Sequence, residues 1–327
     1  MSLFSTSSFS LETLKQAAAL VYQHMPPTPQ YEWPQLSGYL GTTLWVKHEN
    51  HTATGAFKIR GGITFMNWLS QTEPDCRGII TATRGNHGQS QARAAKAFGL
   101  EAHIVVPHGN AREKNDAMQA FGANLIEHGS DFDAAKQEAM NRASAANLVM
   151  VPPYHSEIVV GVATYALELF NAVRDLDVVY VPIGCGSGVC GLVQTRDILN
   201  LKTRIVGVVS TEADAAKQSF EAGQLIETKS AHTFADGMAV RAPIPEAFAI
   251  YSRGVDHMVA VTDEEVAQAI RLYFACTHNV AEGAGAAALA AALQEKAQLQ
   301  GQKVGVILTG GNIDTEVMSA ILRREPV

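Results

Sequence analysis

The sequence has few cysteines, few aromatic residues and little charge. Of its 327 residues, four are cysteines, 7% are aromatic and 17% are charged. Four cysteines in a chain of this length, with no CxxC pair among them, exclude a disulfide scaffold. The formal net charge is −7, and no cluster of Lys and Arg offsets it locally. This charge balance argues against a nucleic-acid partner.

Long apolar runs are missing as well. The longest alanine-rich apolar stretch, residues 284–293, is too short to span a bilayer. Residues 1–10 have neither the basic region nor the long apolar region of a signal peptide. We therefore expect a cytoplasmic protein that has no membrane partner.

The chain is rich in the residues that build a core. Hydrophobic residues make up 47% of it, which excludes a disordered or fibrous chain and is enough for a large packed interior. At roughly 150 residues per domain, the length indicates two domains.

Short apolar runs alternate with helical stretches from residue 78 onward. We expect strands at 79–80, 103–106, 125–126, 148–151, 178–183, 205–209 and 304–308. Helices are expected after the glycine turn at 85–88, at 112–121, 131–145 and 158–173, from 189, and at 262–276. The last of these begins with a capping box made by Thr262 and Glu265. This alternation predicts an α/β protein with two open parallel sheets, and Pro152–Pro153 is a plausible crossing point between them.

A glycine-rich loop, Gly184 to Gly188, follows a predicted strand and opens a predicted helix. Successive glycines let the backbone approach an anion closely, and free N–H groups at a helix start hold a phosphate. With Gly191, the same glycines also spell the GxGxxG fingerprint of dinucleotide-binding proteins, and Glu212 lies near the place of a ribose-binding acid. A plain strand-to-helix turn is the third interpretation.

Lys58 is the most unusual lysine of the chain. It lies in the segment ENHTATGAFKIRGG, residues 49–62, with small residues on both sides and Phe57 directly before it. Small neighbours clear space around the amine, and an aromatic ring can pack on a planar cofactor. Such a lysine forms a Schiff base if it is desolvated enough to lose its proton. The alternative is a surface lysine at the start of a helix.

This segment resembles the pyridoxal-phosphate attachment site of the serine/threonine dehydratases. Five further segments resemble motifs of that family in the same order: residues 83–88 (TRGNHG), 184–188 (GCGSG), 233–237 (TFADG), 281–285 (AEGAG) and 309–312 (TGGN). The likeness extends from about residue 28 to residue 312. Six motifs in one order are far more specific than any single motif.

The resemblance implies a fold-type II pyridoxal-phosphate enzyme with the tryptophan-synthase-β-like fold. Residues 1–70 and 155–327 would form the large cofactor-binding domain, and residues 71–154 would form a small domain inserted in it. The active site would lie in the cleft between them, at strand ends and helix starts. The resemblance also implies a homodimer.

The resemblance implies a role for each motif. Lys58 would bind pyridoxal 5′-phosphate covalently, Phe57 would pack on one face of its ring, and Asn86 would contact its ring hydroxyl. Thr309 would bind the ring nitrogen, and Gly237 would leave room at the other face. The phosphate would be held by Gly184, Cys185, Gly186, Ser187 and Gly188. The amino-acid substrate would be held by Thr83, Arg84, Gly85 and His87.

The implied activity is α,β-elimination from a β-hydroxy amino acid, which gives a 2-oxo acid and ammonia. Lys58 would act as the general base on Cα. A hydroxyl at Thr309 cannot hold the ring nitrogen protonated as an aspartate would, and this favours expulsion of a β-hydroxyl group. Serine, threonine, 3-hydroxyaspartate and an aryl-serine remain open as substrates.

Three departures from the family pattern matter. Ala56 stands where the family usually has serine. Arg84 replaces the serine that acts as the opposite-face acid or base in racemising relatives, which argues against a racemase. Arg84 either pairs with a substrate carboxylate, which would favour an acidic β-hydroxy amino acid, or points into solvent. Val209 and Ala215 stand where metal-binding relatives have Glu and Asp, so we expect no metal site.

Other functions stay open as alternatives. A β-replacement enzyme of the cysteine synthase type would share the fold. A cofactor-binding protein without activity would share the site, but the retention of Lys58, Asn86 and Thr309 together argues against it. A dehydrogenase built on the GxGxxG loop would leave the Lys58 segment unexplained.

Overall fold

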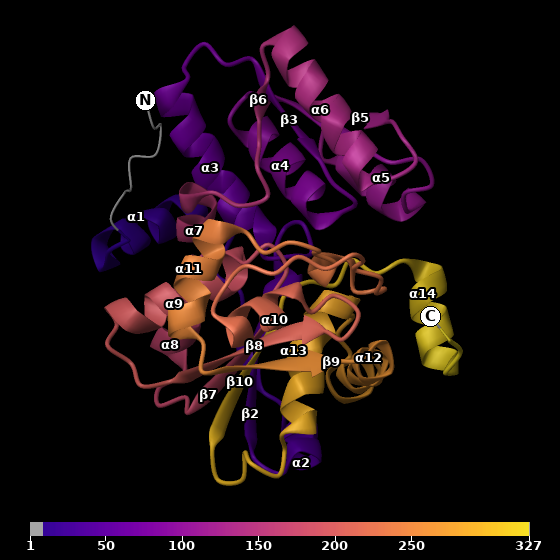
Figure 1. Cartoon of the computed structure of the whole chain (residues 1–327). Helices are drawn as coiled ribbons and strands as arrows, with labels where there is room; N and C mark the ends of the chain where they lie inside the picture. The colour runs from indigo at the N-terminus through magenta and orange to yellow at the C-terminus, as the bar shows by residue number, and fades with distance from the viewer. Residues whose placement is uncertain (1–8, 327) are drawn as a thin grey trace.

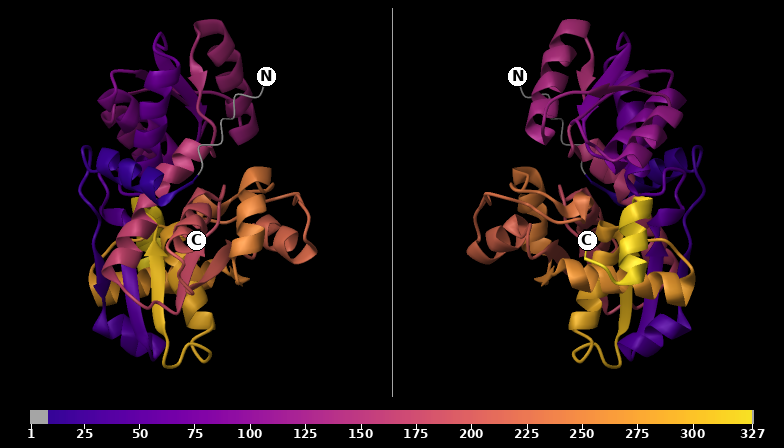
Figure 2. Two further views of the ribbon diagram at one scale, coloured as in Figure 1. Left: turned by 90° about the vertical axis from the view of Figure 1, so that its left-hand side faces the viewer. Right: turned by 90° about the vertical axis from the view of Figure 1, so that its right-hand side faces the viewer.

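The computed structural model describes residues 9–326 and contains two β-sheets. In Figure 1 the smaller sheet lies above the larger one, and the side views of Figure 2 show the same two units. No helix in the described part of the chain is both long and apolar enough to cross a membrane.

The larger sheet has six strands in the order β1-β2-β10-β7-β8-β9. They are β1 (Gln30–Glu32), β2 (Thr43–His48), β7 (Val178–Pro182), β8 (Arg204–Ser210), β9 (His257–Val261) and β10 (Lys303–Leu308). All neighbouring pairs are parallel except β1 and β2. The expected parallel sheet therefore carries one antiparallel strand, a three-residue segment that covers the edge of β2.

The smaller sheet has four parallel strands in the order β5-β4-β3-β6. They are β3 (Gly78–Ala82), β4 (Glu101–Val106), β5 (Ala123–Glu127) and β6 (Val149–Met150). The parallel α/β architecture predicted from the sequence is thus confirmed. All four strands lie inside the range 71–154, but the exact domain division stays a prediction.

Successive strand residues point to opposite faces of each sheet, and helices cover both faces. In the smaller sheet, Ile79 packs towards α4 (Asn86–Ala97), whereas Ile80 packs towards α6 (Phe132–Ala146). In the larger sheet, Val179 packs with α9 (Ser187–Ile198), whereas Val178 packs with α13 (Gly283–Gln294). Two-sided burial explains why these strands read as unbroken apolar runs in the sequence.

The small side chains of helix α13 allow it to be buried on all sides. Its sequence, GAGAAALAAALQ, has ten buried residues, from Gly283 to Ala292. Small side chains on every face let it lie close to the strands below it and to α12 (Asp263–Thr277) beside it. The capping box predicted for α12 is present, because Thr262 and Glu265 each bind the other's backbone N–H.

One predicted helix is wrong. The sequence predicts a single helix over 158–173, but the structure has α7 (Ser156–Val162) and α8 (Thr164–Ala172), separated at Ala163. The hydroxyl of Thr164 donates a 2.7 Å hydrogen bond to the carbonyl of Gly161. This side chain competes for a carbonyl that an uninterrupted helix would use for its own backbone.

Helix α3 (Lys58–Thr72) packs against α4 of the smaller sheet and against α7. Gly161 of α7 allows this contact, because a Cβ at that position would collide with Thr64 and with the backbone of Arg60. The remaining elements are α1 (Leu11–Val21), α2 (Pro34–Leu40), η1 (Glu49–His51), α5 (Arg112–Ala120), α10 (Ala215–Ala222), η2 (Asp236–Met238), α11 (Pro245–Gly254) and α14 (Thr315–Arg323).

Candidate active site

One pocket gathers the sequence motifs. It is lined by Phe57, Lys58, Asn86, Pro182, Gly184, Cys185, Gly186, Ser187, Gly188, Gly237, Glu282, Ala284 and Thr309. Every residue that the sequence assigns to the cofactor is in this set, together with Pro182, Glu282 and Ala284. A separate cavity beside α3 and α4 is lined by none of the residues that the sequence assigns to the cofactor or the substrate.

Four helices begin at the wall of this pocket. Lys58 is the first residue of α3, Asn86 of α4 and Ser187 of α9, and Glu282 is the N-cap of α13. The start of a helix carries unpaired N–H groups and a partial positive charge. The convergence of these starts makes the pocket a place for anionic groups.

The glycine loop forms the first anion cradle. Gly186 has φ +96°, a left-handed conformation that favours glycine. The backbone N–H groups of Gly184 to Gly188 donate to no other group among residues 9–326. A Cβ at Gly184 would collide with the carbonyl oxygen of Gly237, so these two segments touch backbone to backbone. Several unused N–H groups before one helix suit a phosphate.

The loop before α4 forms a second, smaller cradle. The N–H of Gly85 is taken by the hydroxyl of Thr83 at 3.2 Å. The N–H groups of Arg84, Asn86 and His87 donate to no described group. The Arg84 side chain is exposed and forms no ion pair within the described chain. This loop can hold a carboxylate with its backbone, and it offers a free guanidinium beside it.

His87 carries no charge at neutral pH. Burial and the nearby charge of Lys58 lower the pKa of its ring to about 3. A hydrogen bond to the backbone of Val151 raises the pKa but is outweighed. Its Nε2 is buried and has no hydrogen-bond partner in the structure. The hydrogen bond to Val151 uses the one N–H of the neutral ring, so Nε2 can only accept a hydrogen bond. Its contact with a substrate stays a prediction.

The amine of Lys58 has no hydrogen-bond partner among the described residues, and it lies 5.1 Å from the centre of the Phe57 ring. Phe57 is itself fixed: its N–H donates to the carbonyl of Thr309 at 3.0 Å. Its ring meets Tyr165 edge-on, with 6.3 Å between centroids. The lysine therefore extends from a well-held backbone.

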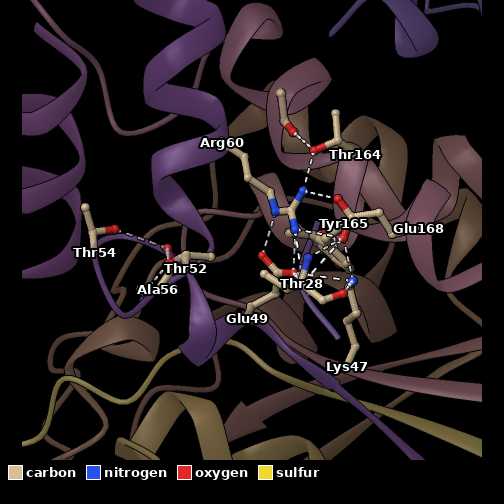
Figure 3. A network of polar contacts seen from close by, with 12 residues as sticks. Thr28, Lys47, Glu49, Thr52, Thr54, Ala56, Arg60, Thr164, Tyr165 and Glu168 are labelled. Carbon is tan, nitrogen blue, oxygen red and sulfur yellow. Dashed lines mark hydrogen bonds and ion pairs between the residues drawn. The ribbon is translucent and has the colours of Figure 1, made fainter. Parts of the chain in front are cut away.

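A buried cluster of four charges supports the start of α3, as Figure 3 shows. Arg60 binds both oxygens of Glu49, at 2.7 and 2.9 Å, and both oxygens of Glu168, at 2.6 and 2.9 Å. Lys47 of β2 binds Glu168 at 2.5 Å. The Arg60, Lys47 and Glu49 side chains are fully buried, and the charges sum to zero.

The partners stabilise the charges of Arg60 and Glu168, whereas burial lowers the pKa of Lys47. Burial disfavours the charge on Arg60, but the two carboxylates outweigh it and raise the pKa of the guanidinium. Burial likewise disfavours the charged Glu168, but Arg60 and Lys47 lower the pKa of that carboxyl. Planar, two-pronged pairing of this kind is specific to arginine.

The lining groups fit pyridoxal phosphate. They supply a primary amine without a partner, a ring that can stack, a phosphate cradle, and the hydroxyls of Ser187 and Thr309, which make no hydrogen bond within the described chain. Burial raises the pKa of the Cys185 thiol, so this residue offers no thiolate. No group of three or more His, Cys, Asp or Glu among residues 9–326 is arranged to hold a metal ion.

The dinucleotide interpretation receives no support from the pocket. Glu212 is exposed and is not part of the lining.

The sequence prediction overlooked two residues of the site, Glu282 and Asn312, although both lie inside quoted motifs. Asn86 donates to Glu282 at 2.7 Å and accepts from Asn312 at 2.8 Å. The only available signal was the place of Glu282 directly before the glycines that open α13.

Comparison with known proteins agrees with this geometry. The family described as pyridoxal-phosphate dependent enzymes matches residues 21–310. Over 316 residues the chain is 33% identical to the L-threonine ammonia-lyase of Thermotoga maritima, covering 96% of this chain and 78% of that protein. It is 31% identical over 317 residues to a biosynthetic L-threonine dehydratase of Haemophilus influenzae, covering 96% of this chain but only 62% of that longer protein.

Solved structures give the same result. The processed form of threonine deaminase isoform 2 from Solanum lycopersicum is similar with a TM-score of 0.89 and 28% identity, and the match covers 97% of this chain and 95% of that one. A maize serine racemase is similar with a TM-score of 0.89 and 27% identity, and the match covers 96% and 97%.

Arg60→Leu tests the charge cluster below Lys58. The substitution leaves two buried carboxylates facing one lysine, so we expect the free energy of unfolding to fall by about 3–5 kcal/mol, measured by urea denaturation. The control is Lys217→Ala, which removes an exposed ion pair with Glu221 and should change stability by less than about 0.5 kcal/mol. Equal effects of the two substitutions would contradict the importance of the cluster.

Proposed function

Because the chain belongs to the family of pyridoxal-phosphate dependent enzymes, we propose that it is an ammonia-lyase that removes the β-hydroxyl group of a hydroxy amino acid. The observation that carries this proposal is that Lys58 and the glycine-loop cradle line one pocket, and that the second cradle adjoins this pocket through Asn86. The other residues assigned to the substrate, Thr83, Arg84, Gly85 and His87, are not among the lining residues. One cradle suits a cofactor phosphate and the other a substrate carboxylate. The threonine ammonia-lyase and dehydratase relatives support the reaction class predicted from the sequence.

Different residues of the pocket would bind different parts of the cofactor. When bound, pyridoxal phosphate supplies an aldehyde that condenses with amines and a ring that draws electrons from the Cα–H bond. Lys58 offers the amine for attachment, and the N–H groups of Gly184 to Gly188 would hold the phosphate. Thr309 lines the pocket, and its hydroxyl would be a neutral partner for the ring nitrogen. A neutral hydroxyl does not stabilise a protonated ring nitrogen as a carboxylate would.

The α4 loop would hold the substrate through its backbone. A carboxylate at the N–H groups of Arg84, Asn86 and His87 benefits from the positive end of α4. Since His87 is neutral, these N–H groups carry the recognition, and the ring adds at most one hydrogen bond. This arrangement fixes the α-carboxylate, which all the candidate amino acids share.

Lys58 would move the proton. Its amine has no competing acceptor in the described chain, so once released it can take the proton from Cα as a general base. Loss of that proton together with the β-hydroxyl removes one water molecule and leaves an enamine. Hydrolysis of the enamine returns one water molecule and releases ammonia and a 2-oxo acid.

A racemase is the second candidate, because the maize serine racemase has the same fold with nearly full coverage. Racemisation needs an acid or base on the face of Cα opposite to Lys58. The resemblance places this group at position 84, where the chain has an exposed arginine. A guanidinium does not exchange protons near neutral pH, which favours elimination. The homodimer and the cytoplasmic location stay predictions.

Lys58→Ala tests the reaction. The wild-type protein, assayed with serine, threonine, 3-hydroxyaspartate and phenylserine, should release a 2-oxo acid from at least one of them. The variant should lose at least about 100-fold in kcat, because both the attachment point and the base are gone. Lys15→Ala, at an exposed position of α1, is the matched control. Undiminished release by Lys58→Ala would refute the mechanism, and inversion of serine without release would favour the racemase.

Arg84→Ala tests what the free guanidinium recognises. If it pairs with a second substrate carboxylate, the loss of a charge-assisted hydrogen bond should lower kcat/KM for 3-hydroxyaspartate by about 10-fold or more. The value for serine should change by less than about 3-fold, because serine has no second carboxylate. Equal losses for both substrates would show that Arg84 does not select acidic amino acids.

A further inference from the structure

The side-chain amide of Asn86 is held at both ends. Asn312 donates through Nδ2 to the backbone carbonyl of Thr54 at 2.8 Å and to Oδ1 of Asn86 at 2.8 Å. A carbonyl oxygen only accepts hydrogen bonds, so the nitrogen of Asn312 must face Thr54. Because the same nitrogen faces Asn86, Asn86 must present its oxygen there. The Thr54 backbone thereby sets the orientation of both amides.

The other end of the same amide is occupied as well. Nδ2 of Asn86 donates to Oε1 of Glu282 at 2.7 Å. An amide nitrogen carries two hydrogens, and one of them is used by Glu282. Since Asn86 and Glu282 both line the pocket, a single N–H of Asn86 is left to serve a ligand there.

The two partners of Asn86 come from the opposite sheet. Asn86 opens α4 of the smaller sheet, whereas Glu282 directly precedes α13 and Asn312 follows β10 of the larger sheet. Glycines make room for both partners. A Cβ at Gly310 would lie 2.5 Å from Oε1 of Glu282, and a Cβ at Gly55, where φ is +69°, would lie 2.5 Å from Oδ1 of Asn312.

The charges around Glu282 make one of these contacts sensitive to pH. Glu282 faces Asn86 of α4, Lys114 of α5, Lys58 of α3 and Asp236 of η2. Burial raises its pKa to about 7, although Asn86 and the two lysines oppose the shift. Below that pH the carboxyl is neutral. Above it, the hydrogen bond from Asn86 gains a charged acceptor and strengthens.

We propose that Glu282 and Asn312 are positioning residues that clamp the Asn86 amide, so that one N–H of Asn86 is aimed at the cofactor ring. Neither residue takes part in bond breaking. The clamp forms only when the unit that carries Asn86 is in contact with the unit that carries Glu282 and Asn312. The orientation of the ring contact therefore depends on the packing of the two units against each other. This inference rests on the proposed function, because it assumes that the pocket holds pyridoxal phosphate.

The experiment compares cofactor binding in Glu282→Ala, Asn312→Ala and the conservative Glu282→Gln with the wild-type protein. The readouts are the visible circular dichroism of the bound cofactor, which reports ring orientation, and the dissociation constant for pyridoxal phosphate. Arg241→Ala is the matched control, because it removes a 2.7 Å contact to Asp133 between the same two units outside the pocket.

We expect both alanine variants to alter the visible circular dichroism and to weaken cofactor binding about 10-fold. Glu282→Gln keeps an acceptor for Asn86, so its affinity should stay within about 3-fold of wild type. The wild-type visible spectrum should contain a component that titrates near pH 7 and is absent from Glu282→Gln. The Arg241→Ala protein should match the wild type in all these measurements.

Two outcomes would overturn the clamp. One is a wild-type spectrum and affinity in both alanine variants. The other is a Glu282→Gln protein that binds the cofactor as weakly as Glu282→Ala. In that case cofactor binding would not depend on whether residue 282 offers Asn86 a hydrogen-bond acceptor. If Glu282→Ala fails to fold, Asn312→Ala carries the test alone. A wild-type protein that binds no pyridoxal phosphate would instead refute the proposed function.

Discussion

The pairing of Arg60 with Glu49 and Glu168 is the interaction on which the site depends. Arg60 lies two residues after Lys58, so a guanidinium bound on two sides fixes the first turn of α3 against η1 and α8. Every charge in the cluster is buried, and displacing any one of them would leave another without a partner. The lysine that the chemistry needs is therefore placed by residues that never meet the substrate.

The second constraint is the geometry of parallel sheets. Helices follow the carboxyl ends of the strands, so α4 and α9 begin at the edges where β3 and β7 end. Of the four helix starts at the pocket, that of α4 comes from the smaller sheet and that of α9 from the larger sheet, and the pocket lies where they meet. The phosphate and the carboxylate can then be held by backbone N–H groups. The side chains at the site are then available to transfer a proton or to contact the cofactor ring.

The structure also shows what local sequence patterns can and cannot predict. The glycine loop was predictable, because a strand, successive glycines and a helix in order determine an anion cradle without long-range information. The six motifs predicted the family, which the comparisons confirm, and every predicted cofactor residue lies in the pocket. The individual roles of these residues stay predictions.

Long-range contacts were not predictable in this way. Glu49 and Arg60 stood in one motif, but nothing local indicated that Glu168, more than one hundred residues later, completes their cluster. Glu282 and Asn312 also lie in the quoted motifs, but only the folded structure shows that they contact Asn86. At the break at Ala163 the Thr164 hydroxyl occupies the Gly161 carbonyl, and the spacing of apolar residues does not predict such a contact.

The central claim is that Lys58 carries pyridoxal phosphate. The most direct measurement is borohydride reduction of the purified holoprotein followed by mass mapping of its peptides. The account predicts that the visible absorbance band is lost and that a phosphopyridoxyl group is found on the peptide containing Lys58. A reduced protein with the group on another lysine, or with no adduct after incubation with pyridoxal phosphate, would contradict it.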